Sequence, residues 1–176
     1  MTPTQRVERL IRNIPDFPQP GIQFKDITPL LDSPAGFKDA VDELLDQSPR
    51  DVDVVAAIES RGFIFGAPMA LALSAGFVPI RKPGKLPGPV FEQDFALEYG
   101  TSTLTMHQDA IKPGQKVLIV DDLLASGGTV VAAAKLIARG GGVVVHTAVL
   151  CELADLDGRA VLTANGLTSV SSILVC

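Results

Sequence analysis

Short runs of apolar residues alternate with longer helical segments along most of the chain. Each apolar run is bounded by Gly, Pro or charged residues, which predicts buried strands at residues 52–58, 77–81, 116–121 and 143–150. The segments 63–75 and 127–139 have the length and apolar content of helices. Strands that are apolar on both faces are typical of parallel sheets covered by helices, so the pattern predicts an α/β fold with a mostly parallel central sheet flanked by helices.

The N-terminal part follows a different pattern. Thr2-Pro3-Thr4-Gln5 has the composition of a helix start, and apolar residues continue at helical spacing as far as Ile14. Residues 14–31 contain four prolines and one glycine, so we expect an ordered loop there rather than a regular helix. Ser33 and Pro34 then predict the start of a second helix.

Two further elements complete the expected fold. Apolar and polar residues alternate on either side of Gly100 between residues 94 and 108, which predicts a β-hairpin that projects from the main sheet. Residues 167–175 predict a strand at the edge of the sheet. The three glycines at 140–142 follow a helix and predict its C-terminal cap rather than a phosphate site.

The composition fits a globular protein of one domain. The chain has 176 residues, of which 47% are hydrophobic, and this is enough for a single core. It has no apolar run long enough to cross a membrane and no signal peptide, so we expect a cytoplasmic protein without a membrane partner. The net charge of −5 argues against a nucleic-acid partner, which would require a clustered basic face.

Histidine and cysteine offer little chemistry. His107 and His146 are the only histidines, which argues against a His-ligated metal site or a Ser-His-Asp triad. We expect His146 to be structural in a buried strand and His107 to lie on a polar strand face. Cys151 and Cys176 have no metal-like spacing, and we expect reduced thiols without a chemical role.

The strongest chemical signal is a strand followed by two acidic residues and a loop of small residues. The strand delivers Asp121 and Asp122 to its carboxyl end, where open α/β sheets bind ligands and where carboxylates can accept hydrogen bonds from ribose hydroxyls. Ala125–Thr129 has little side-chain bulk, so its backbone N–H groups can surround a phosphate at the start of the next helix. The hydroxyls of Ser126 and Thr129 can also donate. These residues predict a site for a phosphorylated sugar.

The chain lacks the residue spacing of two other common phosphate-binding motifs. A Walker A loop requires Gly-Lys followed by Ser or Thr, whereas Gly84-Lys85 precedes Leu86, and no Gly-x-Gly-x-x-Gly follows any predicted strand. An ordinary strand–helix turn with two solvated aspartates is the alternative interpretation of residues 121–129. Elsewhere, Arg81, Lys82 and Lys85 lie within five residues and predict a small electropositive site on an acidic protein.

Five segments together resemble the adenine phosphoribosyltransferases, a family of the type I phosphoribosyltransferases. Residues 117–129 resemble the family's motif for 5-phosphoribosyl-1-pyrophosphate (PRPP). The other four segments occur in the family's order and are Pro15–Pro29, Glu59–Gly66, Arg81–Gly88 and Leu97–Gly100. The resemblance extends over about residues 10–153.

The resemblance implies a fold and an activity. Residues 1–176 would form a single domain of the type I phosphoribosyltransferase fold, with an N-terminal helix and small base-binding hood at 1–32 and a projecting β-hairpin lid at 84–108. The implied enzyme is a glycosyltransferase of the pentosyltransferase class, which converts adenine and PRPP to AMP and pyrophosphate in purine salvage. It implies Mg²⁺ as cofactor, bound mainly through PRPP without a protein metal site, and a homodimer.

The same resemblance implies roles for named residues. Arg61 and Lys82 would bind pyrophosphate, with Arg81 and Lys85 contributing across a dimer interface. The ribose and its 5′-phosphate would be bound by Asp121, Asp122, Leu123, Ala125, Ser126, Gly127, Gly128 and Thr129. A non-proline cis peptide bond is implied between Glu59 and Ser60.

Adenine recognition and proton transfer are assigned to other segments. The main chain of Gln23, Phe24 and Lys25 would contact the six-membered ring of adenine. Glu98 would exchange a proton near the purine N7, with Tyr99 beside it on the lid, and Arg61 would be the third catalytic residue. An exposed hairpin tip is the alternative interpretation of Glu98 and Tyr99.

The chain departs from the family in two places. Thr105 stands where the family usually carries Glu, and residues beyond Leu153 have little of the family's pattern, so we predict no function for them. Three other functions stay open: a transferase for hypoxanthine, guanine, xanthine or orotate, a PRPP-sensing regulator that binds nucleic acid, and a sugar-phosphate binder without turnover. The segment Pro15–Pro29 argues against the first, the absence of a basic module against the second, and Glu98 with the basic cluster against the third.

Overall fold

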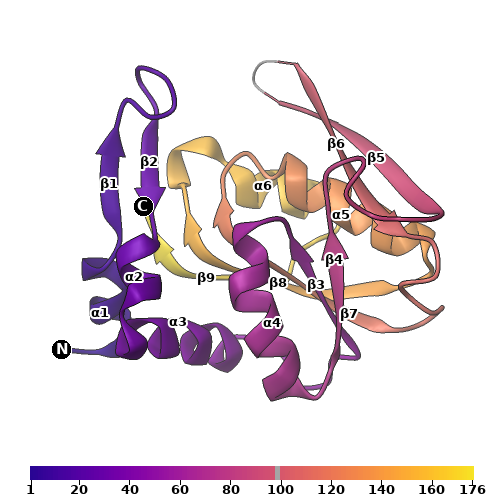
Figure 1. Ribbon diagram of the computed structural model, residues 1–176, viewed down its shortest axis with the longest axis horizontal. Helices are drawn as coiled ribbons and strands as arrows, with labels where there is room; N and C mark the ends of the chain where they lie inside the picture. Colours follow the sequence, from indigo (N-terminus) through magenta and orange to yellow (C-terminus); the bar gives the residue numbers. More distant parts are fainter. Residues whose placement is uncertain (98–99) are drawn as a thin grey trace. The chain divides into compact units, whose positions relative to one another are not determined.

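Five parallel strands form the central sheet in the order β4-β3-β7-β8-β9 (Figure 1). The computed structural model describes residues 1–97 and 100–176, which form two compact units, Met1–Glu43 and Leu44–Cys176. The sheet belongs to the second unit and consists of β3 (Val54–Ile58), β4 (Gly76–Ile80), β7 (Lys116–Leu124), β8 (Val143–Glu152) and β9 (Val170–Val175). The predicted parallel α/β fold is confirmed.

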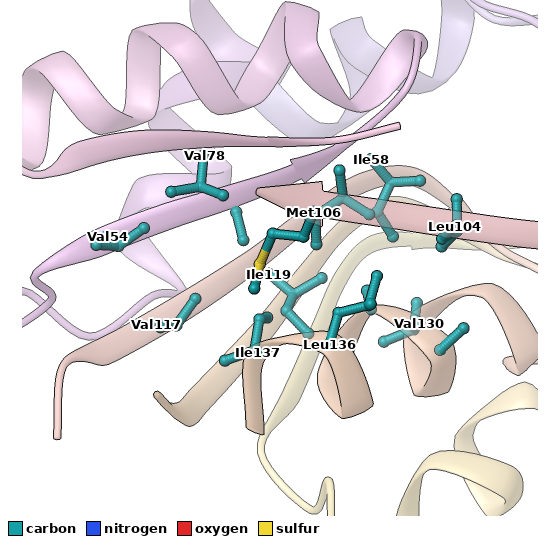
Figure 2. Packing of buried hydrophobic residues seen from close by; sticks show 14 of the residues in the cluster. Val54, Ile58, Val78, Leu104, Met106, Val117, Ile119, Val130, Leu136 and Ile137 are labelled. Carbon is teal, nitrogen blue, oxygen red and sulfur yellow. The ribbon is translucent and has the colours of Figure 1, made fainter. Parts of the chain in front are cut away.

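Two helices cover opposite faces of this sheet. On one face, α4 (Arg61–Leu73) approaches β3 so closely that a Cβ atom on Gly66 would lie 2.6 Å from the Cβ of Ala57. On the other face, α5 (Gly128–Arg139) contributes Leu136 and Ile137 to a buried cluster that includes Ile119 (Figure 2). Apolar runs are therefore continuous in the inner strands because each strand is buried on both sides.

The predicted hairpin is also present. Strands β5 (Val90–Ala96) and β6 (Thr101–His107) pair in antiparallel register and extend away from the sheet in Figure 1. The C-terminal half of β6 turns its apolar residues inward, and Met106 is fully buried in the cluster of Figure 2. The hairpin is thus attached to the core at its base.

The C-terminal segment contains more structure than the sequence predicted. Strand β9 is the predicted edge strand, but it is preceded by a 3₁₀ turn, Ala154–Leu156, and by a short helix, α6 (Gly158–Ala164). Seven residues with a glycine at the start give too weak a periodic pattern to predict a helix. The thiols of Cys151 and Cys176 lie 3.1 Å apart at the end of β8 and just beyond β9.

The first unit, described by itself, contains α1 (Pro3–Arg9), β1 (Arg12–Pro15), β2 (Gln23–Asp26), α2 (Thr28–Asp32) and the start of α3 (Pro34–Asp46). The predicted capping box of α1 is confirmed, because Thr2 and Gln5 each accept a hydrogen bond from the other's backbone N–H. The helix is shorter than its apolar spacing predicted, since Ile14 pairs with Phe24 in the β1–β2 hairpin.

The expected loop at 14–31 is a further correction, because it contains this hairpin and α2. Pro15 is the last residue of β1, where it faces Gln23 at the end of a two-stranded hairpin, and Pro18 and Pro20 lie in the turn between the strands. Pro29 lies in the first turn of α2, where a missing N–H costs nothing. No helix among residues 1–97 and 100–176 is both long and apolar enough to cross a membrane.

His146 is buried in β8, as predicted. It is 7% exposed, and its two ring nitrogens each lie 2.8 Å from a serine hydroxyl, those of Ser169 and Ser171. Burial lowers the pKa of His146 below its ordinary value, because the charged imidazolium loses hydration.

We expect His146→Asn to make the fold less sensitive to acid. The unfolded chain binds a proton at His146 near its ordinary pKa of about 6.5, whereas the folded protein binds it only at lower pH. The stability that neutral His146 contributes is therefore complete above the pKa of the unfolded chain and is lost as the pH falls through the lower pKa of the folded protein. Urea unfolding between about pH 7.5 and pH 5 should show a smaller loss of unfolding free energy in the variant than in the wild type. His107→Asn is the control; equal losses in wild type and His146→Asn would contradict the prediction.

Candidate active site

Asp121 and Asp122 lie within β7 rather than at its end. The sequence predicted a strand ending at residue 121, but β7 continues to Leu124 because β8 pairs with it as far as Glu152. Asp122 is 6% exposed, and its backbone N–H donates a 2.8 Å hydrogen bond to Oδ1 of Asp121. The two carboxyl groups remain in the carboxyl-terminal half of the central strand, which is the predicted side of the sheet.

Arg61 supplies the counter-charge for this pair. Its Nε lies 3.0 Å from Oδ2 of Asp122. Arg61 is the first residue of α4, and α4 reaches β7 because the next residue is Gly62, where a Cβ atom would lie 2.8 Å from the carbonyl oxygen of Val120. Any side chain at Gly62 would displace the start of α4 and Arg61 with it.

The environment raises the pKa of both acids. Burial raises the pKa of Asp121 well above its ordinary value, and the neighbouring charge of Asp122 raises it further. Burial also raises the pKa of Asp122, against the opposing effect of Arg61. A ligand that donates hydrogen bonds to the ionised carboxylates would relieve part of this cost, so the pair is suited to binding hydroxyl groups.

The turn from β3 to α4 contains the predicted cis peptide bond, between Glu59 and Ser60. Beside it, Oε2 of Glu59 accepts hydrogen bonds from Nε of Arg81 at 2.8 Å and from the backbone N–H of Lys82 at 3.1 Å. Glu59 therefore connects the end of β3 with the basic segment that follows β4. The basic segment and the acidic pair lie on either side of the same short turn.

Arg81 makes several contacts within its own chain. Its Nη1 donates to the carbonyl of Lys85 at 3.3 Å, and its guanidinium lies 5.8 Å from the ring centroid of Phe63. Its backbone pairs with Thr105, whose hydroxyl donates to the Arg81 carbonyl at 3.0 Å. The side chains of Lys82 and Lys85, by contrast, are exposed.

Sequence reasoning missed two residues of this region. It gave no role to Glu59, although a carboxylate that directly follows a buried strand and faces a basic cluster is a usable signal. It noted Thr105 only as a departure from the family, whereas the structure has Thr105 1% exposed and bonded to Arg81.

The loop of small residues overlaps the start of α5, which begins at Gly128, one residue after the predicted start of this helix, and includes Thr129. Gly127 has a φ of +86°, a backbone conformation that L-residues rarely adopt. Within the described chain, no side chain caps the first N–H groups of α5, and unpaired N–H groups at a helix start attract anions. A pocket of about 50 Å³ lies here, lined by Leu123, Leu124, Ala125, Ser126, Gly127, Thr129 and Val130.

The residues assigned to adenine belong to the first unit. Gln23, Phe24 and Lys25 lie in β2, with Gln23 exposed and the other two half-buried. Lys25 donates a 2.7 Å hydrogen bond to Asn13, and the ring of Phe24 packs edge-on against Phe17 at 5.1 Å.

The remaining predicted site residues, Glu98 and Tyr99, lie outside the described residues. Within the described residues, no group of three or more His, Cys, Asp or Glu side chains is arranged to hold a metal ion.

Comparison with known proteins identifies relatives across nearly the whole chain. The family profile of the phosphoribosyl transferase domain matches residues 27–164. Adenine phosphoribosyltransferase of Cutibacterium acnes is 56% identical over 96% of this chain and 95% of its own length.

Solved structures agree with this match. The crystal structure of adenine phosphoribosyltransferase from Thermoanaerobacter pseudethanolicus has a TM-score of 0.93 and 46% identity, covering 98% of this chain and 99% of that one. The Saccharomyces cerevisiae enzyme, complexed with D-2,5-dideoxy-2,5-imino-altritol 1,6-bisphosphate and adenine, has a TM-score of 0.87 and 34% identity, covering 98% of both chains. The family profile and these close relatives show that the chain belongs to the adenine phosphoribosyltransferases of the type I phosphoribosyltransferase family.

Proposed function

We propose that this protein transfers the 5-phosphoribosyl group from PRPP to adenine, giving AMP and pyrophosphate. The observation that carries the proposal is the pair of half-buried Asp121 and buried Asp122 beside Arg61, followed closely by a glycine loop at the start of α5. The segment 121–129 offers acceptors for sugar hydroxyls and uncapped N–H groups, and Arg61 of α4 adds a cation beside them. Membership of the adenine phosphoribosyltransferases supports adenine as the base.

The charges that develop during the reaction determine the role of each group. When the bond from C1′ to pyrophosphate breaks, positive charge grows on the ribose and negative charge on the leaving group. Asp121 and Asp122 would orient the ribose through its hydroxyls, and the N–H groups of Ala125–Thr129 would bind the 5′-phosphate. A fixed sugar and a stabilised leaving group are the two requirements of this transfer.

Pyrophosphate is assigned to the basic residues around the β3–α4 turn. Arg61 already faces the acidic pair, and the exposed side chains of Lys82 and Lys85 are able to reach an anion. Arg81 is bonded to Glu59, so within one chain its contribution would be to shape the turn, while direct contact across a dimer interface remains part of the proposal.

Mg²⁺ would arrive with PRPP, bound mainly through the oxygens of the substrate. The oxygen donors of Asp121 and Asp122 fit the preference of Mg²⁺ for hard ligands. When bound, the ion would supply positive charge to the pyrophosphate as it leaves.

Base recognition and proton transfer follow the family assignment. The main chain of Gln23–Lys25 would accept from the exocyclic amine of adenine and donate to N1. Glu98 would exchange a proton near N7, and Tyr99 would help the lid hairpin, 84–108, to exclude water.

Domain organisation, assembly and location are also proposals. We infer one catalytic domain over residues 1–176, with a base-binding hood at 1–32, acting in purine salvage in the cytoplasm. A homodimer is supported by apolar side chains exposed on adjacent elements of the second unit, Leu71 of α4 at 84% and Phe77 of β4 at 38%. Such a surface is typical of an interface with another copy of the chain.

Base choice tests the proposed function. Hypoxanthine presents an acceptor at O6 and a donor at N1, which reverses both main-chain contacts, and each buried group left unpaired costs about 1–3 kcal/mol. We expect kcat/KM for adenine to exceed that for hypoxanthine by about 30-fold to 10⁴-fold, measured as nucleotide formation from PRPP. Gln23→Ala should keep this ratio because the recognising groups are main-chain. Similar values for both bases would exclude the adenine assignment and favour another transferase of the superfamily.

The acidic pair should be essential for turnover. Replacing both Asp121 and Asp122 with Asn keeps their size but removes charge-assisted hydrogen bonds of about 1.5–3 kcal/mol, so kcat/KM for PRPP should fall at least about tenfold. The matched control is the double variant of Asp51 and Asp53 to Asn, which changes two carboxylates at the opposite end of the sheet beside Lys116. Near-normal activity of the first variant would show that the motif has another role.

Glu98→Gln tests the proposed proton transfer. The substitution preserves size and removes the ionisable group, so kcat should fall by about 10²- to 10⁴-fold while PRPP affinity changes little. Steady-state kinetics and direct PRPP binding separate the two effects. Parallel losses in both would point to a structural role for the hairpin.

A further inference from the structure

The C-terminal segment, for which the sequence predicted no function, contacts the small-residue loop. A Cβ atom on Gly158, the first residue of α6, would lie 2.2 Å from the carbonyl oxygen of Ala125. A Cβ atom on Gly127 would in turn lie 2.9 Å from the carbonyl oxygen of Gly158. The backbone of α6 therefore packs directly on the backbone of the loop, and the position of α6 limits the conformations open to the loop.

A cluster of polar groups, here named the Arg159 cluster, fixes the start of α6. It consists of Arg159, Glu152, the carbonyl of Val170 and the hydroxyl of Ser172. Arg159 binds Glu152 through two nitrogens, with Nε 3.0 Å from Oε1, and its Nη1 donates to Val170 at 2.9 Å. Ser172 donates to Oε2 of Glu152 at 3.0 Å. The cluster thus joins α6 to β8 and β9 at one point.

The cluster also reaches the strand from which the loop departs. Glu152, the last residue of β8, pairs with Leu124, the last residue of β7, and the N–H of Leu153 donates to the Leu124 carbonyl at 2.9 Å. The loop begins at the next residue, Ala125. The loop is therefore held by two connected sets of contacts. Leu124, the residue before it, pairs with Glu152, and Gly158 of α6 lies against Ala125 and Gly127 within it.

Burial and charge support a persistent pair. Glu152 is 7% exposed, and the hydrogen bonds from Arg159 hold the pKa of its carboxyl group below the ordinary value. Removal of Arg159 would leave a buried carboxylate without its cation, so the end of β8 and the start of α6 would have to rearrange.

We propose that Arg159 and Glu152 are positioning residues for the 5′-phosphate of the substrate. They act through α6, which holds Ala125–Gly127 in the conformation that directs the loop's N–H groups to the phosphate. The proposal rests on the proposed function, because it assumes that this loop binds the 5′-phosphate. It predicts a selective effect, since Arg61 and Lys82, assigned to pyrophosphate, follow other strands, β3 and β4.

Direct binding measurements on the full-length protein test the proposal. Isothermal titration calorimetry with ribose 5-phosphate and with Mg²⁺-pyrophosphate reports the two subsites separately. We expect Arg159→Met to weaken ribose 5-phosphate binding by roughly 3- to 30-fold and to leave pyrophosphate binding within about twofold. Arg159→Lys, which keeps the charge but not the paired geometry, should lie between wild type and Arg159→Met.

A double-mutant cycle and a matched control sharpen the test. Adding Glu152→Gln to Arg159→Met should cause little further loss, because both act through one contact. Arg139→Met is the control, since Arg139 also donates to a backbone carbonyl, that of Glu92, but lies at the far end of α5. The control should bind both ligands as the wild type does.

Milder variants cover the case in which Arg159→Met does not fold. Arg159→Lys and Ser172→Ala remove individual bonds only, are measured in the same way, and should each weaken ribose 5-phosphate binding selectively.

The outcomes separate the positioning role from the proposed function. Unchanged ribose 5-phosphate binding in the folded Arg159 variants would overturn the positioning role while the proposed function stands. Equal weakening for both ligands would also overturn it, because it would show general destabilisation. A wild-type protein that binds pyrophosphate but not ribose 5-phosphate would overturn the assignment of the loop itself, and the positioning role with it.

Discussion

The site depends on the ion pair between Arg61 and Asp122. A carboxylate that is 6% exposed is costly without a nearby cation, and the Arg61 guanidinium supplies that cation at 3.0 Å. The pair also joins the first residue of α4 to the central strand β7. Because Asp121 is bonded to the backbone of Asp122, the position of both acids follows from this contact. Buried carboxylates with raised pKa values reduce the stability of the folded protein, and such groups are typical of functional sites.

Two glycines allow the backbone approaches around this pair. Gly62 brings α4 against the carbonyl of Val120, and Gly158 brings α6 against the carbonyl of Ala125. Helix α4, which precedes β7 in the chain, therefore supports the acidic pair. Helix α6, which follows β8, supports the loop after that pair. Ligand groups at such a site meet preorganised backbone and side-chain dipoles, which is the main way in which proteins stabilise developing charge.

Periodic patterns predicted the elements that are buried on both faces. Strands β3, β7 and β8 and helices α4 and α5 appear where their apolar runs placed them, within a few residues. The predicted element boundaries were wrong where a strand pairs with a distant segment in a way that the local sequence pattern does not indicate. Ile14 has helical spacing but pairs with Phe24 across a hairpin, and β7 runs past residue 121 because β8 continues beside it. Pairing with a distant strand adds hydrogen bonds that no local pattern contains.

The sequence alone determined the chemical character of the site and the family, since the order strand, Asp-Asp, small residues and helix already specifies acceptors beside uncapped N–H groups. Only the tertiary structure decided which charges neutralise each other. Arg61–Asp122 joins α4 to β7, Arg81–Glu59 joins the residues that directly follow β4 and β3, and Arg159–Glu152 joins α6 to β8. The last pair gives the tail beyond Leu153 a place beside the loop. The partners Arg61–Asp122 and Arg81–Glu59 are far apart in the sequence and meet through strand order and helix packing, which neighbouring residues do not determine.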